Sequence, residues 1–501
     1  MIRLPTLGLD SLPLLLVPWQ EGADPDGLGD LALTEMEPRA LTMHHVFLVL
    51  GFALGLLLVL RLLRERDRPS VTWAWLLTMV FVPWIGVPGY LLLGGRKVRQ
   101  RVARKGRLAL EAHGPLPADA GPVEHLLAAE GVGPARAGNT VTWLEDGEEA
   151  WADLLELIEG ARETLDVALF LLAKDRVGQA FVDALARKAR EGVRVRLLLD
   201  AFGCLPARGR FLDPLREAGG RVGVFMRILP IWPGRRANLR NHRKLALADG
   251  ERAWTGGRNV AEEYLGPPGL VPKERWVDLS VGVRGPVVAD LARLFAADWA
   301  FATGEGSEPA KPGNGVPNAV AESSTVQLVP SGPDVPTDAL ADALLAAVGQ
   351  ARKRVWIVTP YFVPDEPLTR ALLCQARMGR HVRLVLPERS NPAFTDFARG
   401  PFVRELVAAG GEVLLVRDAM VHAKLVLCDD GAVALGSANV DLRSLYLNFE
   451  LALLVRDDAF RARAEQWVEG LARRSVRAEG TPPGAVRRWL EDLGRLVAPV
   501  L

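Results

Sequence analysis

The chain reads V-H-A-K-L-V-L-C-D-D-G-A-V-A-L-G-S-A-N-V-D-L-R from Val421 to Arg443. Its polar and small residues follow the spacing H-x-K-x4-D-x6-G-S-x-N and are His422, Lys424, Asp429, Gly436, Ser437 and Asn439. Apolar residues alternate around His422 and Lys424, which predicts a strand with both side chains on one face. A glycine-bounded turn and a second strand follow, and Asn439 comes directly after that strand.

The same pattern occurs a second time, nearer the N-terminus. The segment N-H-R-K-L-A-L-A-D-G-E-R-A-W-T-G-G-R-N runs from Asn241 to Asn259. At identical spacings it contains His242, Lys244, Asp249, Gly256, Gly257 and Asn259. Two chance copies of so specific a string are very improbable, so the chain contains an internal duplication.

This pair of motifs resembles the HKD signature of the phospholipase D superfamily, and within it the chain is most similar to bacterial cardiolipin synthases. The likeness covers the chain from about residue 45 to its end. Four further stretches share it: Y-F-V-P-D at 361–365, G-S-A-N-V-D-L-R-S at 436–444, L-N-F-E at 447–450 and F-A-A-D-W-A-F-A-T-G at 295–304. The resemblance implies two pseudo-symmetric domains that form one active site, and a covalent phosphohistidine intermediate.

The amino-acid composition excludes few classes of protein. The 501 residues are 49% hydrophobic and 24% charged, which is ordinary for a globular protein with room for two cores. The net charge of +1 gives no support for nucleic-acid binding, which favours a strongly basic domain. Cys204, Cys374 and Cys428 lie far apart, with no C-x-x-C spacing. We therefore expect neither a disulfide framework nor a zinc site, and a reducing compartment fits.

The N-terminal part differs in character from the rest. Residues 1–40 are rich in Pro, Gly, Asp and Glu and predict a flexible extension, which has no counterpart in the family pattern. Two apolar segments, 41–60 and 71–93, each have about the 20 residues that a membrane helix needs. They predict a transmembrane helical hairpin over 41–95, with buried core helices as the alternative. Proline and glycine interrupt the second segment, so a re-entrant segment is a further alternative.

Residues 96–138 form a predicted basic juxtamembrane linker. Its first part contains Arg96, Lys97, Arg99, Arg101, Arg104, Lys105 and Arg107. Because positive charge favours the cytoplasmic side, we expect a multi-pass protein of the inner membrane with cytoplasmic catalytic domains. The same cluster suits anionic lipid headgroups.

The remainder is predicted to form two α/β domains, at 139–304 and 325–501. In each of them strands and helices alternate in the same order, which is typical of an α/β sandwich. A Gly/Pro-rich linker, 305–324, separates the two. The C-terminal residues 485–501 have apolar side chains at helical spacing and are expected to pack on the second domain, with a membrane-surface helix as the alternative.

Each half supplies one His, one Lys and one Asn, which is an incomplete site alone. Phosphoryl transfer requires attacking and leaving groups roughly in line, with negative charge on the nonbridging oxygens. His242 and His422 can provide that line, with His242 as nucleophile and His422 as acid and base. The phosphate oxygens can be neutralised and hydrogen-bonded by the remaining pairs, Lys244 with Lys424 and Asn259 with Asn439. We expect no metal and no cofactor.

Supporting residues follow from the repeat. Aligning the strands after each motif equates Asp278 with Glu450, which we expect to orient the catalytic histidines. Gly257 and Ser437 are expected to let the backbone approach the phosphate. Asp249 and Asp429 are counted with the catalytic signature, although their place beyond the lysine favours structural support. Several arginines near the motifs either bind a headgroup or form a solvated rim: Arg235, Arg236, Arg240, Arg243 and Arg443.

The function expected from these features is transfer of a phosphatidyl group between two phosphatidylglycerol molecules, giving cardiolipin and glycerol. Two alternatives are a phospholipase D and a transferase that uses another alcohol. A nuclease of the superfamily and an inactive membrane scaffold fit less well. Membrane lipids are the expected partners, and self-association is left open.

Overall fold

The computed structural model describes residues 56, 58, 69–82, 86–87, 90, 116, 120–226, 239–266, 275–306, 323–335, 337–392 and 394–497. The chain divides into two compact units, Met1–Pro83 and Trp84–Leu501. In the first unit, helix α2 extends over Pro69–Phe81. Among the described residues no helix combines the length and the apolar character needed to cross a bilayer. The predicted segment 41–60 and the extension 1–40 lie almost wholly outside the described residues.

The second unit opens with a first half that ends at helix α10. Its elements are α5 (Pro122–Ala129), β1 (Arg136–Leu144), α6 (Gly147–Gly160), β2 (Thr164–Leu169), α7 (Arg176–Arg190), β3 (Arg194–Asp200), η2 (Gly209–Leu212), α8 (Asp213–Glu217), β4 (Arg221–Phe225), β5 (Leu245–Ala248), β6 (Arg252–Gly256), α9 (Glu262–Leu265), β7 (Ser280–Arg284) and α10 (Val287–Thr303).

A second half repeats this order. It contains β8 (Ser324–Ser331), α11 (Ala339–Gln350), β9 (Arg354–Val358), β10 (Phe362–Val363), α12 (Glu366–Arg377), β11 (His381–Pro387), α13 (Phe394–Ala408), β12 (Glu412–Val416), β13 (Leu425–Cys428), β14 (Val433–Gly436), β15 (Val440–Asp441), α14 (Leu442–Tyr446), β16 (Glu450–Arg456), α15 (Asp458–Arg473), β17 (Ser475–Arg477) and α16 (Ala485–Val497).

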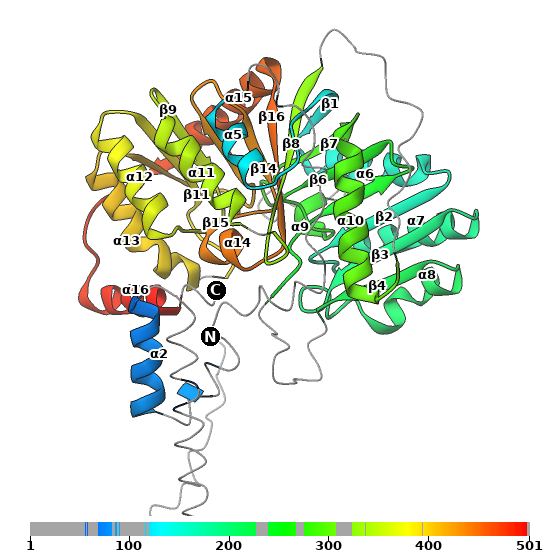
Figure 1. Ribbon diagram of the computed structural model, residues 1–501, viewed down its shortest axis with the longest axis horizontal. Helices are drawn as coiled ribbons and strands as arrows, with labels where there is room; N and C mark the ends of the chain where they lie inside the picture. Colours follow the sequence, from blue (N-terminus) through cyan, green and yellow to red (C-terminus); the bar gives the residue numbers. More distant parts are fainter. Residues whose placement is uncertain are drawn as a thin grey trace, which may run out of the picture. The chain divides into compact units, whose positions relative to one another are not determined.

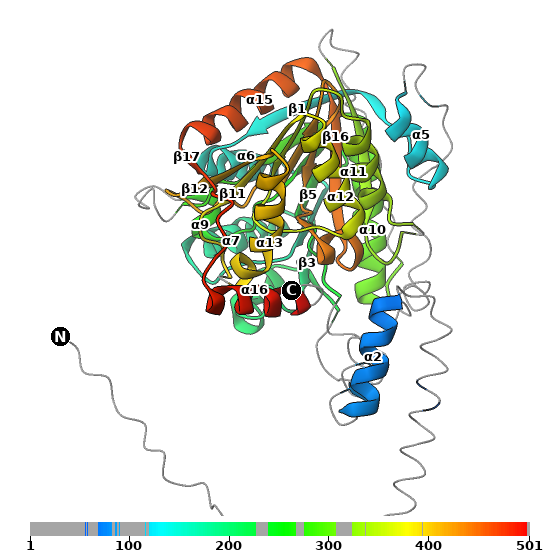
Figure 2. The ribbon, with the colours of Figure 1, turned by 90° about the vertical axis from the view of Figure 1, so that its left-hand side faces the viewer.

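The two halves share one sheet, with strand order β17-β12-β11-β9-β13-β14-β16-β8-β1-β7-β6-β5-β2-β3-β4. Strands β1 and β8 join the halves by an antiparallel pairing whose register shifts between Arg136 and Asn139. On either side of this junction the order is the same, with β17 added at one edge. Figures 1 and 2 show helices covering the sheet on both halves. The α/β class is confirmed, and the strands of both halves form one continuous sheet.

The two halves share buried aliphatic strands and aspartate N-caps at corresponding places. The parallel strands β2, β3, β9 and β11 are built from aliphatic runs that are buried almost throughout, as expected when helices cover both faces. Helices α7 and α12 begin at corresponding aspartates. Asp175 accepts a hydrogen bond from the N–H of Gly178, and Asp365 accepts one from Leu368. These N-caps fix where each helix starts.

One hydrophobic core spans both halves. It contains Leu291 of α10 and Phe460 of α15, together with strand residues of each half such as Leu247 and Leu427. The halves therefore bury apolar side chains against each other, and in addition each half has a core of its own.

One boundary differs from the sequence prediction. The segment expected as a linker, 96–138, includes α5 and the start of β1, and its Leu127 and Val132 are buried in the core of the second half. The helix has only eight residues, and the basic residues earlier in the segment favoured a linker in the sequence prediction. At the other end, α16 packs on α13, where Arg404 donates to the buried Glu491 at 2.6 Å. The expected packing of the C-terminal helix is confirmed.

Candidate active site

The two motif histidines lie directly before β5 and β13. His242 donates its backbone N–H to the carbonyl of Phe449 at 2.9 Å, and His422 donates its own to Val277 at 2.7 Å. Phe449 precedes β16 of the second half, while Val277 precedes β7 of the first. Each motif is thus held by a backbone bond to the opposite half, and the two motifs meet.

The carboxylate partner of each histidine also comes from the opposite half. His242 Nδ1 lies 2.9 and 3.0 Å from the carboxylate oxygens of Glu450. His422 Nδ1 lies 2.6 Å from Asp278 Oδ2. Both carboxylates are fully buried. The alignment of the repeat identified this pair of acids, but it gave no indication that they are exchanged between the halves.

Burial sets the charge of the imidazoles. It lowers the pKa of His242 to about 4, against the attraction of Glu450. Burial and the Lys424 ammonium together lower the pKa of His422 to about 3. Burial opposes ionisation of Asp278, yet His422 and Lys424 lower its pKa to about 2. At pH 7 both rings are therefore neutral, and each directs Nδ1–H to a carboxylate and keeps a lone pair on Nε2.

The two lysines lie against the histidines. Lys244 donates to the carbonyl of His242 at 2.6 Å, and its Nζ lies 5.2 Å from the centre of the Phe170 ring. Lys424 donates to the carbonyl of His422, and its Nζ lies 2.8 Å from His422 Nδ1. Because Nδ1–H is directed to the carboxylate, Nδ1 cannot accept from the ammonium, and the ring atom to which Lys424 can donate is Nε2, at 3.2 Å. Burial lowers the pKa of Lys244 well below its ordinary value, and an anion bound beside the lysines would favour the charged form of both.

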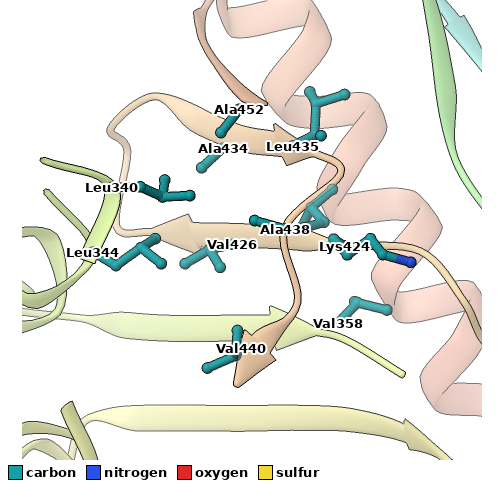
Figure 3. Close-up of a pocket in the computed structure, with 12 residues that line it drawn as sticks. Leu340, Leu344, Val358, Lys424, Val426, Ala434, Leu435, Ala438, Val440 and Ala452 are labelled. Carbon is teal, nitrogen blue, oxygen red and sulfur yellow. The ribbon is translucent and has the colours of Figure 1, made fainter. Parts of the chain in front are cut away.

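A small aliphatic pocket lies behind Lys424 (Figure 3). Its volume of about 20 Å³ is close to that of one water molecule, so it holds no part of a lipid. The labelled side chains around it are Leu340, Leu344, Val358, Val426, Ala434, Leu435, Ala438, Val440 and Ala452. The pocket removes water from the lysine stem, and burial lowers the pKa of Lys424 to about 8.

Asn259 and Asn439 complete the cluster. Both side chains are buried, and neither amide oxygen has a hydrogen-bond partner among the described residues. An unsatisfied buried polar atom is costly, and these oxygens are acceptors, so they suit a hydroxyl donor, whereas only the amide N–H groups can donate to a phosphate oxygen.

The family follows from comparison with known proteins. A family model described as "Cardiolipin synthase, PLD-like domain" matches residues 154–299 and 344–472, more than half of the chain. The chain belongs to the cardiolipin synthase family. It is therefore an enzyme of the phospholipase D superfamily. A second model, described as "Phospholipase_D-nuclease N-terminal", matches residues 53–95.

Curated relatives match over most of their length. Cardiolipin synthase 1 of Bacillus anthracis is 32% identical, with 87% of this chain and 90% of the relative covered. Cardiolipin synthase A of Pseudomonas entomophila is 33% identical, with 85% and 92% covered. Among solved structures, phosphatidylserine synthase of Haemophilus influenzae has 16% identity and a TM-score of 0.57, covering 76% of this chain and 100% of that one. This last likeness concerns the fold.

Sequence reasoning missed a buried ion pair behind the first motif of this cardiolipin synthase family member. Arg243 is buried and donates to both carboxylate oxygens of Asp298, at 2.7 and 2.8 Å. It also donates to the backbone carbonyls of Glu450 and Ser331, at 3.0 and 3.2 Å. Neither a headgroup ligand nor a solvated rim, the two readings expected of Arg243, fits this position. The only sign in the sequence was a difference between the two motifs: the second has Ala423 at the position that Arg243 occupies in the first.

Asp249 and Asp429 lie away from the histidines, which corrects their inclusion among catalytic residues. Each follows its strand, seven residues beyond the histidine, or roughly 20 Å along an extended chain. Asp249 accepts three backbone N–H bonds at 2.8 Å, from residues 162–164. Asp429 accepts three from residues 352–354, at 2.6 to 2.9 Å. Their expected structural role is confirmed.

We predict that Asp249→Asn and Asp429→Asn each destabilise the fold by about 2 kcal/mol, because a charged acceptor of three N–H bonds is replaced by a neutral one. Both aspartates have a left-handed backbone, with φ of 54° and 49°, which asparagine tolerates. The substitution therefore tests the hydrogen bonds alone. Thermal unfolding in detergent measures the loss. Lost activity in protein that remains fully folded would contradict the structural role.

Gly257 and Ser437 occupy equivalent places with different chemistry. Ser437 Oγ donates to Glu450 Oε2 at 2.5 Å. A Cβ at Gly257 would lie 2.1 Å from the Asp278 carboxylate, so this position has no space for a side chain. One site position therefore combines Gly257 with the shorter Asp278. The equivalent position combines Ser437 with the longer Glu450.

We predict that Gly257→Ser lowers the turnover rate about a hundredfold, because it displaces Asp278 from His422 and misplaces the imidazole. Ser437→Gly removes the hydroxyl's hydrogen bonds with Glu450 and with the Leu451 backbone, and is expected to cost about tenfold. Gly306→Ser is the matched control, since its Cβ would meet nothing within 4 Å. Comparable rates for Gly257→Ser and the control would contradict the prediction.

Proposed function

We propose that the protein makes cardiolipin by transferring a phosphatidyl group from one phosphatidylglycerol to the hydroxyl of a second, through a phosphohistidine. One observation carries the mechanism: two buried, neutral histidines meet at one site, each oriented by a carboxylate of the opposite half. The names of the relatives support the lipid product.

In the first step His242 Nε2 attacks the phosphorus of the donor. The bond from phosphorus to the glycerol oxygen breaks, and His422 gives that oxygen a proton. His422 is neutral in the free enzyme, but an anionic phosphodiester beside it favours the imidazolium and raises its pKa. Lys244 and Lys424 neutralise the nonbridging oxygens, and the paired asparagines hydrogen-bond them.

In the second step the phosphorus–nitrogen bond is broken. The hydroxyl of the second phosphatidylglycerol loses its proton to His422 Nε2 and attacks phosphorus, which frees His242. The product is cardiolipin, and both histidines return to their starting charge. Glu450 stabilises the positive charge that forms on His242 during attack, and Asp278 does the same for His422.

Membrane lipids are the proposed partners, and the inner membrane is the proposed location. The apolar segments 41–60 and 71–93 and the match of residues 53–95 to an N-terminal family model support this. We keep the proposed cytoplasmic orientation, which rests on the basic residues after residue 95.

The rate is predicted to depend on pH in two directions. Activity rises as pH increases through about 4, because only neutral His242 can attack. It falls at higher pH for two reasons: His422 must hold a proton to act as the acid of the first step, and Lys424, with a pKa of about 8, loses the charge that binds the phosphate. The measurement is kcat/KM across pH with a dispersed short-chain substrate and a parallel check that the protein stays folded. An acid limb near the ordinary histidine value would contradict the burial argument.

The product spectrum tests the proposed function. Detergent-purified protein receives labelled phosphatidylglycerol in EDTA, with His242→Ala as the blank. Cardiolipin together with free glycerol is the expected result. Phosphatidic acid alone would identify a hydrolase, and a new phospholipid formed only with an added alcohol would identify another transferase. A strict requirement for magnesium would overturn the metal-free mechanism.

A further inference from the structure

The catalytic histidines lie at one defined edge of the structure. His242 precedes β5, whose first residue pairs with Ala168 at the carboxyl end of β2. His422 precedes β13, whose first residue pairs with Val358 at the carboxyl end of β9. Strand β3 runs parallel to β2, and β11 runs parallel to β9. Segments that directly follow β3 and β11 therefore emerge beside the histidines.

The segment after β3 presents the first apolar patch, Phe202 and Leu205. Their side chains are 64% and 56% exposed. The backbone beneath them is fixed, because the Asp200 carboxylate accepts the N–H groups of Phe202 and Gly203 at 2.8 and 3.1 Å. Cys204 is buried and its Sγ lies 3.2 Å from a main-chain oxygen of the first half. The apolar side chains thus project from a rigid support.

This patch is coupled to the site. Asp200 also accepts the backbone N–H of Asn241, the neighbour of His242, at 3.0 Å. The guanidinium carbon of Arg240 lies 5.8 Å from the centre of the Phe202 ring. Basic side chains continue along the segment at Arg208 and the exposed Arg210.

Helix α16 presents the second apolar patch, Val486 and Trp489, which are 76% and 64% exposed. The helix packs on the first turns of α13, which follows β11: a Cβ at Gly494 would lie 3.0 Å from the backbone nitrogen of Ala398. Its outward face also carries the exposed Arg487 and Arg488. In Figure 1, α16 and α8 lie toward the lower edge of the unit, on opposite sides.

The distribution of exposed apolar groups is one-sided. Within the described part of residues 84–501, five large hydrophobic side chains are exposed, and four of them form these two patches. The fifth, Met378, follows the carboxyl end of α12, at the opposite edge. Apolar side chains flanked by arginine are the composition of surfaces that enter the headgroup region of anionic membranes.

We propose that these two patches, one from each half, dock the catalytic unit on an anionic lipid bilayer so that the histidines face the headgroups. This inference rests on the proposed function and specifies how the lipid reaches the site. The apolar side chains enter the interface, the arginines contact lipid phosphates, and the phosphodiester of a lipid that stays in the bilayer reaches the histidines from between the patches.

The test uses the full chain in phosphatidylglycerol vesicles. A fluorophore is attached to the cysteine introduced by Phe202→Cys, Trp489→Cys or Met378→Cys. Each variant is combined with Cys374→Ser and Cys428→Ser, which remove the exposed and the half-buried native thiols and leave only the buried Cys204. Quenching by brominated lipids is expected to be several-fold stronger at 202 and 489 than at 378. Equal quenching at all three positions would overturn the proposal. Quenching at only one patch would overturn the two-sided arrangement.

An activity arm separates this proposal from the proposed function. Phe202→Ser with Leu205→Ser, and Val486→Ser with Trp489→Ser, are each expected to lower the rate on vesicles about tenfold. On dispersed short-chain phosphatidylglycerol they should stay within about twofold of wild type, since no catalytic contact is removed. Met378→Ser is the control. Wild type without cardiolipin formation would reject the proposed function, whereas equal losses on both substrates would reject docking.

Discussion

His242→Ala and His422→Ala are each expected to lower cardiolipin formation by about a hundred- to ten-thousand-fold, the range for loss of a general acid or base. The effect should lie at the upper end for His242, because without Nε2 no covalent intermediate forms. His125→Ala is the matched control, since His125 is an exposed residue of α5. Activity within about tenfold of wild type in either variant would contradict the two-histidine mechanism.

The covalent step gives these variants separate signatures. Labelled donor lipid should leave an acid-labile, alkali-stable label on wild-type protein, as expected of a phosphorus–nitrogen bond. His242→Ala should carry none. His422→Ala should acquire the label slowly and keep it, because no base activates the acceptor. If His242→Ala retained the label and His422→Ala lacked it, His422 would be the nucleophile and His242 the acid and base. The covalent mechanism itself would stand.

Asp278→Asn and Glu450→Gln are expected to cost about a hundred- to ten-thousand-fold, although neither residue touches the phosphate. A side-chain amide can donate to Nδ1, which places the ring proton on Nε2 and removes the lone pair that the mechanism needs. It also leaves the positive charge formed during catalysis uncompensated. Protein stability should fall less than activity, because the substitutions are nearly isosteric.

Each carboxylate orients the histidine of the opposite half, so the two substitutions should affect different steps of the reaction. Because Glu450 orients His242, Glu450→Gln should block formation of the covalent label. Asp278 orients His422, so Asp278→Asn should slow its decay. Glu479→Gln, at an exposed carboxylate, is the control. The reverse assignment of these two signatures would contradict the exchange between halves.

The duplication itself was decided by the sequence. Two copies of the motif at identical spacing, and the same succession of strands and helices around them, predicted the repeated α/β halves. This worked because strand and helix periodicity and glycine-bounded turns are local properties. The pairing of Asp278 with Glu450 as equivalent acids also came from local alignment.

Contacts between residues far apart in the chain could not be predicted from such local patterns. The sequence left Arg243 as a headgroup ligand or a solvated basic residue, whereas the fold buries it against Asp298, 55 positions away. It likewise could not indicate that α5 belongs to the core of the second half. Burial depends on which elements pack together, and an eight-residue apolar helix gives no local signal of the half against which it packs.

Local sequence patterns predicted the members of the proposed site: a histidine, a lysine, an asparagine and a carboxylate from each half. How these residues combine depends on the fold. Strands β1 and β8 join the halves, so that each histidine takes its carboxylate from the other, and burial then keeps both imidazoles neutral. The reason is physical. Residue types and spacings are encoded locally, whereas partners and pKa values depend on distances between segments that meet only in the folded protein.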